Sequence, residues 1–316
     1  MQPWSFVHVT DIHIGSPRSF RFNPGYNENW LIARAQIVEL APDLLLVGGD
    51  VARDGNIHTY ELEAVREDLG GLPFPYHVVP GNMDTGNKHI YRPSFRTDRD
   101  DRALNITSAQ LRHFEAVFGS SSWSFVHKQV RFSGFCDMIL GSGLPEEEPL
   151  WRWLEAQAEL AAAEPSQYHV WMMHSAAFIE RPDEPDWDPG QADTYHDWYF
   201  APDLAVRRRL MEIFRASGAD LVLSGHVHCR KRHLAGGIQF DISPSTAFPQ
   251  WGHRWPDGDD TLGFVRYTVT DAGLEYDFVP LARTSDTKGY GPSGHPLPHL
   301  RDYSIADETG GDPQAG

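Results

Sequence analysis

Five apolar, strand-like segments of this chain are each followed directly by side chains that can bind a metal ion. The residues that follow them are Asp11 and His13, Asp50, Asn82, His174, and His226 and His228. Loops at the ends of strands can converge on one point, so ligands placed there can meet although they lie far apart in the sequence. The chain must therefore fold so that five strand ends lie close together.

Apolar runs and helix-like stretches alternate along most of the chain. The runs before the candidate ligands cover residues 4–10, 43–47, 76–79, 169–173 and 220–224. Helix-like stretches cover residues 28–40, 58–69, 108–118, 150–163 and 204–216. This alternation predicts an α/β fold whose central strands are mainly parallel.

Shorter apolar runs indicate additional β-structure. Runs that predict hairpins lie at residues 122–126, 130–135 and 138–140. A second β-rich region contains runs at residues 237–242, 263–269 and 274–279. Two sheets packed together with helices outside would accommodate all of these elements.

We expect one domain over residues 1–283, followed by a tail rich in glycine and proline over residues 284–316. Such a tail is expected to lie over the surface or to be disordered. Two insertions, near residues 85–105 and 181–203, each follow a metal motif directly. We therefore expect both insertions to overhang the site as loops.

The acidic composition excludes some classes of partner. Lysine and arginine together number 27 and aspartate and glutamate 44, which gives a formal net charge of −17. A surface of this charge disfavours nonspecific binding to duplex nucleic acid or to anionic lipid. A small anionic substrate stays compatible with it, because two bound dications would reverse the local field.

Two further features concern location and redox state. The chain does not open with a basic segment followed by an apolar one, and no apolar run has the length of a membrane span, which predicts a cytoplasmic protein. The two cysteines, Cys136 and Cys229, are too few for a disulfide framework. We interpret Cys229 as a buried thiol rather than as a spare ligand beside His228.

The spacing of the candidate ligands suits a metal site. Asp11 and His13 are two residues apart, which points both side chains the same way in an extended chain, and His226 and His228 repeat this spacing. Asp50 follows two glycines, which allow the backbone to turn sharply close to an ion. The chain thus offers two paired sets of donors and one carboxylate that can approach an ion closely.

The remaining donors are enough for a second ion. Asp50 has two carboxylate oxygens and could bridge two metals, Asn82 offers an amide oxygen, and His174 offers a nitrogen. Two ions roughly 3.5–4 Å apart can hold a bridging hydroxide and clamp both oxygens of an in-line displacement. Mixed ligation by aspartate, asparagine and histidine suits manganese, iron or zinc better than calcium. We therefore predict two divalent transition-metal ions as cofactors and a metal-bridging hydroxide as the nucleophile.

The order of the motifs resembles the calcineurin-like metallophosphoesterase superfamily: Asp-x-His, Gly-Gly-Asp, Gly-Asn-x-Asp, a single His and Gly-His-x-His. These motifs span residues 11–228, and the β-rich stretch to about residue 280 also fits. Residues 243–246, Ser-Pro-Ser-Thr, resemble a segment of the cyclic nucleotide and glycerol phosphodiester branch. The resemblance implies a four-layer α/β/β/α sandwich of two mixed sheets flanked by helices.

The resemblance also implies how the ligands are shared between the ions. Asp50 would bridge, and the further ligands would be Asp11, His13 and His228 for one ion and Asn82, His174 and His226 for the other. The residues expected to take part in catalysis are Asp50, Asn82 and His226.

One position departs from the family pattern. Many members have a histidine after the asparagine, where it stabilises or protonates the leaving group, and this chain has Met83, which cannot donate a proton. Candidate acids on the two insertions are His89, Tyr195 and His196. A metal-bound water, or a leaving group that needs no proton, is an equal alternative. Asp84, in the same motif, is expected to be structural or to tether a ligand.

The motifs predict hydrolysis of a phosphoric ester, with small phosphodiesters, cyclic nucleotides included, as the favoured substrates. The insertions and the acidic surface favour a small ligand over a nucleic-acid polymer. The alternatives are a phosphomonoesterase or phosphoprotein phosphatase, a nuclease, and a metal-binding homologue without turnover.

Two groups of side chains have more than one interpretation. The aromatic residues of the second insertion, which could stack on a base or anchor the loop by packing, are Trp187, Tyr195, His196, Trp198 and Tyr199. The basic residues that could meet a second phosphate charge, or be solvated, are Arg92, Arg96, Arg99, Arg230 and Lys231.

Overall fold

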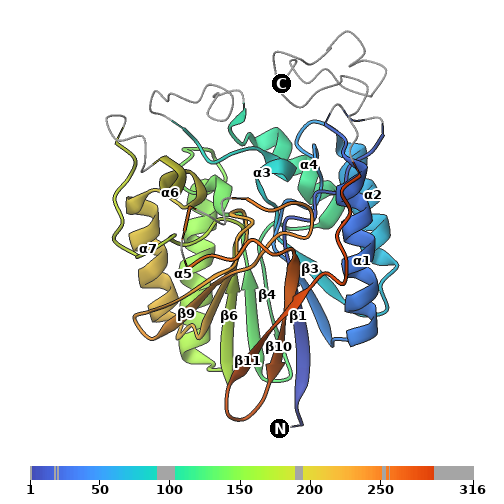
Figure 1. Cartoon of the computed structure of the whole chain (residues 1–316). Coiled ribbons are helices and arrows are strands. Elements are labelled where there is room, and N and C mark those ends of the chain that lie inside the picture. The colour runs from blue at the N-terminus through green and yellow to red at the C-terminus, as the bar shows by residue number, and fades with distance from the viewer. Residues whose placement is uncertain are drawn as a thin grey trace.

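Two β-sheets lie at the centre of the molecule, with helices on both sides (Figure 1). The computed structural model describes residues 2–17, 19, 21–90, 104–188, 195–250, 254–255 and 257–287. In β1 (Trp4–Val9), Trp4 and Phe6 pack between the sheets, whereas Val7 and Val9 pack toward helices. This alternation follows from the two-residue period of a strand that is buried on both faces.

The first sheet contains three of the strands that precede candidate ligands. Its order is β11–β10–β1–β2–β3, where β2 is Leu44–Val47, β3 is Tyr76–Val78, β10 is Gly263–Val269 and β11 is Leu274–Pro280. The strands β1, β2 and β3 run parallel, whereas β10 and β11 are antiparallel to their neighbours. The carboxyl ends of β1, β2 and β3 therefore lie at one edge.

The second sheet contains the other two such strands. Its order is β4–β5–β6–β7–β9–β8, with bounds Trp123–His127, Val130–Gly134, Tyr168–Met172, Leu221–Ser224, Ile238–Ile242 and Lys231–Ala235. The strands β5, β6, β7 and β9 run parallel, and β4 and β8 are the antiparallel edges. The strand β8 has no signal in the sequence, because its charged residues give no apolar alternation.

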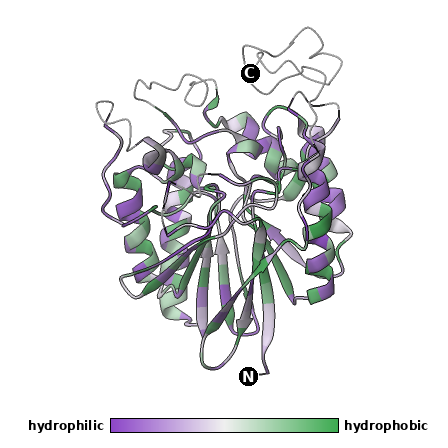
Figure 2. Cartoon of the chain, in the orientation of Figure 1, coloured by the Kyte–Doolittle hydropathy of each residue, from purple (hydrophilic) through white to green (hydrophobic). Residues whose placement is uncertain are grey.

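Helices cover the outer face of each sheet, as Figure 1 shows. The first sheet packs against α1 (Pro24–Leu40), α2 (Thr59–Gly70) and α4 (Ser108–Phe118), and the second against α5 (Glu147–Ala163) and α7 (Leu204–Ala216). In Figure 2 these helices carry both hydrophilic and hydrophobic residues, as expected for helices with one face on a sheet and one in water. A third apolar cluster fills the space between the sheets. The predicted four-layer sandwich is confirmed.

The prediction of a strand at residues 138–140 is wrong. Asp137–Ile139 forms a single turn of 3-10 helix. The carboxylate of Asp137 accepts the backbone N–H groups of His174 and Ser175 at 2.8 and 3.2 Å. Because these bonds tie the segment to the loop after β6, the chain closes into a turn instead of pairing as a strand.

The two insertions contain helical segments as well as loops. The short helix α3 (Asn82–Thr85) leads into the first, and α6 (Tyr195–Phe200) lies in the second. The first insertion is closed at its base, because Asn87 N–H donates to Leu104 O and Ile106 N–H donates to Asn87 O, both at 2.7 Å. Residues 91–103 and 189–194 of the insertions lie outside the described residues.

The start of the tail lies against α1. Ser285 N–H donates to Asn29 Oδ1 at 2.6 Å, and residues 288–316 lie outside the described residues. Within the part of the chain that the structure describes, no helix is both long and apolar enough to span a membrane. The domain limit at residue 283 and the cytoplasmic location stay predictions.

Candidate metal centre

The structure brings the seven candidate ligands together at the carboxyl ends of five parallel strands. They follow β1, β2, β3, β6 and β7, and each of the seven side chains is buried. They form two clusters that share one carboxylate.

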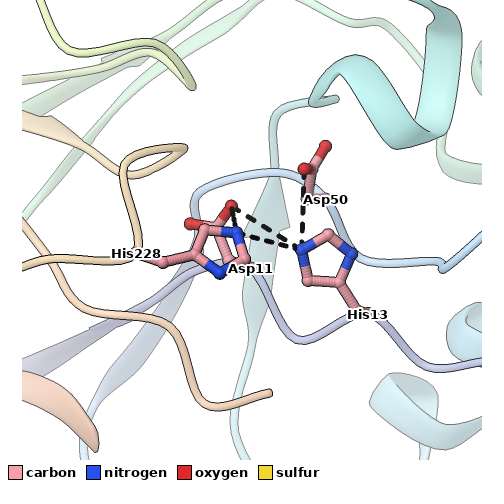
Figure 3. Close-up of side chains that lie close together, drawn as sticks. All are labelled: Asp11, His13, Asp50 and His228. Atoms are coloured by element: carbon pink, nitrogen blue, oxygen red, sulfur yellow. Dashed lines mark hydrogen bonds and ion pairs between the residues drawn. The ribbon is translucent and has the colours of Figure 1, made fainter. Parts of the chain in front are cut away.

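The first cluster consists of Asp11, His13, Asp50 and His228 (Figure 3). The Nε2 atom of His228 lies 3.1 Å from Asp11 Oδ1 and 3.2 Å from His13 Nε2. The Nε2 atom of His13 lies 4.0 Å from Asp11 Oδ1 and 3.7 Å from Asp50 Oδ2. Four donor atoms from three loops therefore converge.

The second cluster consists of Asp50, His174 and His226, with Asn82 beside them. The Nε2 atom of His174 lies 3.4 Å from Asp50 Oδ1 and 3.3 Å from Asn82 Oδ1. Asp50 thus presents Oδ2 to the first cluster and Oδ1 to the second. The shared carboxylate places the two clusters next to each other.

Five of these residues have left-handed backbone conformations. The φ angles are 53° at Asp11, 47° at His13, 49° at Asp50, 66° at His226 and 56° at His228. The expectation that both Asp-x-His and His-x-His lie in extended chain is therefore wrong. Each such residue outside glycine costs on the order of 1–3 kcal/mol, and such strain concentrates at functional sites.

The position before Asp50 has no room for a side chain. Gly49 has φ 94°, and a Cβ atom at this position would lie 2.6 Å from His174 Nδ1 and 2.7 Å from Gly81 N. An alanine would push these atoms away. Close approach of the backbone to the second cluster therefore requires glycine here.

Backbone carbonyls orient two of the histidines. His174 Nδ1 lies 2.8 Å from Gly48 O, and His228 Nδ1 lies 2.9 Å from Phe248 O. A carbonyl only accepts hydrogen bonds, so each Nδ1 donates its hydrogen and each Nε2 faces its cluster. This is the orientation that a histidine ligand needs.

Polar neighbours orient the oxygen donors. Asn82 Nδ2 donates to Asn87 Oδ1 at 2.9 Å, which turns Asn82 Oδ1 toward His174. The N–H of Met83 donates to Asp50 Oδ1 at 2.8 Å. No local sequence pattern marks Asn87, so its role appears only in the structure.

Asp84 joins the loop after β2 to the loop after β3. Its carboxylate accepts the backbone N–H groups of Val51, Ala52 and Gly81 at 3.2, 3.0 and 2.8 Å. Burial and the nearby charge of Asp50 raise the pKa of Asp84 to about 7. Asp137, which no sequence pattern marks, holds the loop after β6 in a similar way.

Burial and charge set the protonation of the site. Burial lowers the pKa values of His13 and His226 well below the usual value, so both rings are neutral. Burial by itself would raise the pKa of Asp11, but a facing histidine lowers it. Burial by itself would lower the pKa of His174, but the charges of Asp50 and Asp11 raise it to about 10. Excess negative charge that binds a proton so strongly also attracts a metal cation.

An oxygen without a hydrogen-bond partner shows that a cation fits the first cluster. Asp11 is fully buried, and its Oδ2 accepts from Thr10 Oγ1 at 2.8 Å and from the N–H of His226 at 2.9 Å. Its Oδ1 makes no hydrogen bond among the described residues and faces His228 Nε2 at 3.1 Å. A buried carboxylate oxygen in this state is costly unless a cation faces it. The mixed oxygen and nitrogen donors suit a divalent transition metal.

A pocket of about 240 Å³ opens onto both clusters. Its walls include two basic side chains and three aromatic rings, which are Arg21, Arg53, Tyr199, Phe200 and Phe248. Of these five residues, only Tyr199 was a candidate from the sequence. The sequence alone does not mark the other four, because the five residues come from four separate loops or helices that only the fold brings together.

The structure places two of the candidate acids away from this pocket. His89 Nε2 lies 2.9 Å from Ile106 O, and Tyr195 is fully buried among Trp187 and Trp198. Neither residue lines the pocket that the described residues form. The side chain of His196 lies outside the described part of the chain.

The aromatic residues of the second insertion have different roles. Trp187, Tyr195 and Trp198 pack together in one buried cluster, whereas Tyr199 lines the pocket. These three rings therefore anchor the second insertion, and only Tyr199 among the described ones is placed to meet a substrate.

The basic residues after the last ligand have structural partners. Lys231 is buried and its Nζ lies 2.6 Å from both Glu180 and Asp257. Arg230 forms an ion pair with Asp259. The charges of both residues are thus paired with carboxylates of the chain. Cys229 is a buried free thiol, and residues 92, 96 and 99 lie outside the described residues.

A protein-family model described as calcineurin-like phosphoesterase matches residues 5–230. The chain belongs to this family. The match runs from β1 through all seven candidate ligands, so this metallophosphoesterase is a metal-dependent phosphoric ester hydrolase.

Similar proteins include both a phosphatase and a phosphodiesterase. Serine/threonine-protein phosphatase CPPED1 of Danio rerio is 27% identical over 308 residues, which is 90% of this chain and 87% of that protein. A 3′,5′-cyclic-nucleotide phosphodiesterase of Nostoc is 23% identical over 256 residues, 78% of this chain and 79% of that protein. A dimetal phosphatase from Danio rerio has the same fold, with a TM-score of 0.52 at 14% identity over 88% of this chain and 99% of that one.

Proposed function

We propose that this metallophosphoesterase is a binuclear enzyme that hydrolyses small phosphodiesters, cyclic nucleotides included. The observation that carries the proposal is the meeting of seven buried oxygen and nitrogen donors in two clusters that share Asp50. In this proposal Asp50 bridges, and the other ligands are Asp11, His13 and His228 for one ion and Asn82, His174 and His226 for the other.

The chain supplies orientation, and the ions supply charge. Two divalent ions of manganese, iron or zinc, when bound, would lower the pKa of a water nucleophile and neutralise the phosphoryl oxygens. Backbone carbonyls hold His174 and His228 in place, and Asn87 holds the amide of Asn82. Because these ligands are held before substrate binds, little reorganisation is needed during the reaction.

Three observations support a diester as the substrate. The pocket of about 240 Å³ suits a small ligand. The rings of Tyr199, Phe200 and Phe248 offer apolar surface to the alcohol parts of an ester. The relative from Nostoc, similar over 78% of this chain, is named as a cyclic-nucleotide phosphodiesterase.

A phosphomonoesterase is the second candidate, and Arg53 favours it. A monoester carries one more negative charge than a diester and needs more cationic groups around it. Arg53 lines the pocket, its guanidinium lies 5.6 Å from the ring centroids of Tyr26 and Phe248, and no described carboxylate forms a salt bridge with it. The relative CPPED1 is named as a phosphatase.

Arg53→Gln separates the two candidates. If Arg53 binds the extra charge of a monoester, the variant loses about 10- to 100-fold in kcat/KM on 4-nitrophenyl phosphate, since a hydrogen bond to a charged group contributes about 1.5–3 kcal/mol. Hydrolysis of bis(4-nitrophenyl) phosphate should change little. Both esters are compared with manganese-, iron- and zinc-loaded enzyme.

Arg266→Gln is the matched control for this experiment, because Arg266 pairs with Asp277 on β11 and lies outside the pocket. Wild-type preference for the diester, with an equal effect of Arg53→Gln on both esters, would remove the monoester candidate. Absence of hydrolysis of both esters with all three metals would overturn the proposed function.

Met83 predicts a steep dependence of rate on the leaving group. Met83 lines the pocket and cannot donate a proton, so an alkoxide would have to leave without help. We expect aryl esters to react well and alkyl esters poorly, and Met83→His to raise the rate on alkyl esters by up to about 10²-fold. A series of 4-nitrophenyl, phenyl and alkyl diesters measures this dependence.

A flat dependence in the wild type would contradict this prediction, because it would require another acid. His196→Ala would then be the first variant to test, because a change that makes the dependence steep identifies the acid. His89→Ala and Tyr195→Phe should leave the dependence flat, because neither residue lines the pocket that the described residues form. Metal content is measured for Met83→His, because its backbone N–H contacts Asp50 and a displaced ligand would mimic a loss of acid catalysis.

A further inference from the structure

One buried lysine connects the two insertions. Lys88 lies in the first insertion and is 8% exposed. Its Nζ donates to the backbone carbonyls of Trp198 and Ala201 at 2.5 and 2.8 Å and to Asp203 Oδ1 at 3.1 Å. These acceptors lie at the carboxyl end of α6, where the last helix carbonyls lack partners within the helix.

These contacts use the full donor capacity of the ammonium group. Lysine has three N–H donors, and three oxygens from α6 and the residues after it accept from Lys88. The ammonium also lies 4.0 Å from the ring centroid of Trp198. A buried lysine with this set of partners holds a segment in place and is not available to a ligand.

The helix that Lys88 holds forms one wall of the pocket. Tyr199 and Phe200 both line the pocket, and their ring centroids lie 5.4 and 4.9 Å from that of His226. The other side of α6 packs into the buried cluster that contains Tyr195 and Trp198. The position of the wall therefore depends on how α6 is held.

The residue before Lys88, Asn87, contacts a candidate ligand of the second metal cluster. Asn87 accepts the hydrogen bond from Asn82 that turns the amide oxygen toward His174. Asn87 thus contacts the candidate ligand Asn82. Lys88, the next residue, contacts α6, which packs on the candidate ligand His226. This juxtaposition fixes the distance between the second cluster and the aromatic wall.

We propose that Tyr199 and Phe200 form the wall that selects the alcohol part of the ester, and that Lys88 is the positioning residue for this wall. The inference rests on the proposed function, because it assigns one side of the same pocket. The substrate class that fits is an ester of an aryl or nucleoside alcohol, whose flat group can lie against the two rings. Inorganic phosphate has no such group and would not contact the wall.

Lys88→Met tests the proposal through two measurements. The KM for bis(4-nitrophenyl) phosphate should rise at least about tenfold, since small misplacements of a positioning group can cost up to about 10²-fold. The inhibition constant of inorganic phosphate should stay within about twofold of the wild-type value, because phosphate is held by the metal side of the pocket. The metal content should stay at the wild-type value.

Hydrogen exchange provides a readout that does not depend on activity. Loss of three hydrogen bonds should make the amides of residues 195–203 exchange at least about tenfold faster in Lys88→Met. Lys231→Met is the matched control, because Lys231 is also buried and its ammonium binds Glu180 and Asp257, which lie outside residues 195–203. This control should leave both the exchange of residues 195–203 and the phosphate inhibition constant at the wild-type values.

Tyr199→Ala tests the wall if Lys88→Met does not fold. It should raise the KM of the aryl diester and leave phosphate inhibition unchanged. An unchanged aryl KM in Tyr199→Ala, or a parallel rise of the phosphate inhibition constant, overturns the assignment of the wall. If hydrogen exchange of residues 195–203 is unchanged in Lys88→Met, Lys88 is not the positioning residue for the wall. A wild-type enzyme that hydrolyses no ester overturns the proposed function instead, so the failures are distinguishable.

Discussion

Asp50→Asn is expected to remove at least one metal ion per chain and to lower kcat/KM by more than about 10³-fold, which exceeds the cost of losing a single oxyanion donor. Its two carboxylate oxygens lie 3.4 Å from His174 Nε2 and 3.7 Å from His13 Nε2, so one side chain serves both clusters. An amide keeps one neutral oxygen and turns an N–H group toward a ligand atom. Metal analysis of the purified variant and ester kinetics measure the two effects.

Asp241→Asn is the control for loss of a buried carboxylate. Asp241 is 1% exposed and accepts hydrogen bonds from Tyr267 and Arg232, but it belongs to neither cluster. This variant should keep both ions. An Asp50→Asn variant that also keeps both ions, or a crystal structure with Asp50 far from any ion, would contradict the binuclear proposal.

The sequence predicts where the ligands lie because each one follows an apolar run. The run before Asp50, for example, was expected at residues 43–47, and β2 is Leu44–Val47. The helix at residues 108–118 was predicted with the bounds that the structure has, and a capping box of Thr107 and Gln110 marks its start. Local patterns of this kind depend on neighbours in the chain, so they can be read without a structure.

The backbone at the ligands could not be predicted in this way. The N–H of Asp11 donates to Gly49 O, and the N–H of His13 donates to Asp50 O, both at 3.0 Å. These bonds join the loop after β1 to the loop after β2 and hold Asp11 and His13 in the left-handed region. Two-residue spacing in the sequence carries no information on hydrogen bonds between separate loops, and these bonds set the backbone here.

The residues that support the ligands were missed for the same reason. Lys88 lies 110 and 113 residues before the carbonyls that it binds, and Asp137 lies 37 and 38 residues before the N–H groups that it accepts. Arg53 becomes a candidate substrate contact only because the fold places it beside the clusters. A motif records the ligands, whereas their supporting contacts depend on the tertiary structure.

Single histidine changes should separate the two ions. His13→Ala and His228→Ala are expected to lower the affinity for one ion by more than about 100-fold. Loss of a residue that only hydrogen-bonds to a metal ligand already lowers metal affinity about 10–100-fold. His174→Ala and His226→Ala are expected to weaken the other ion to a similar degree. The reason is geometric: His13 and His228 face each other at 3.2 Å, and His174 faces Asp50 from the other side. Elemental analysis with anomalous scattering locates the ion that remains.

Double variants test whether the grouping is right. Two changes within one cluster should cost little more than either change alone, because the first already removes the ion that both ligands share. One change from each cluster, such as His228→Ala with His174→Ala, should remove both ions and leave Asp50 without a metal to bridge. If His13→Ala behaves as a partner of His174→Ala and not of His228→Ala, the ligand assignment is wrong, even where the total number of ions is two.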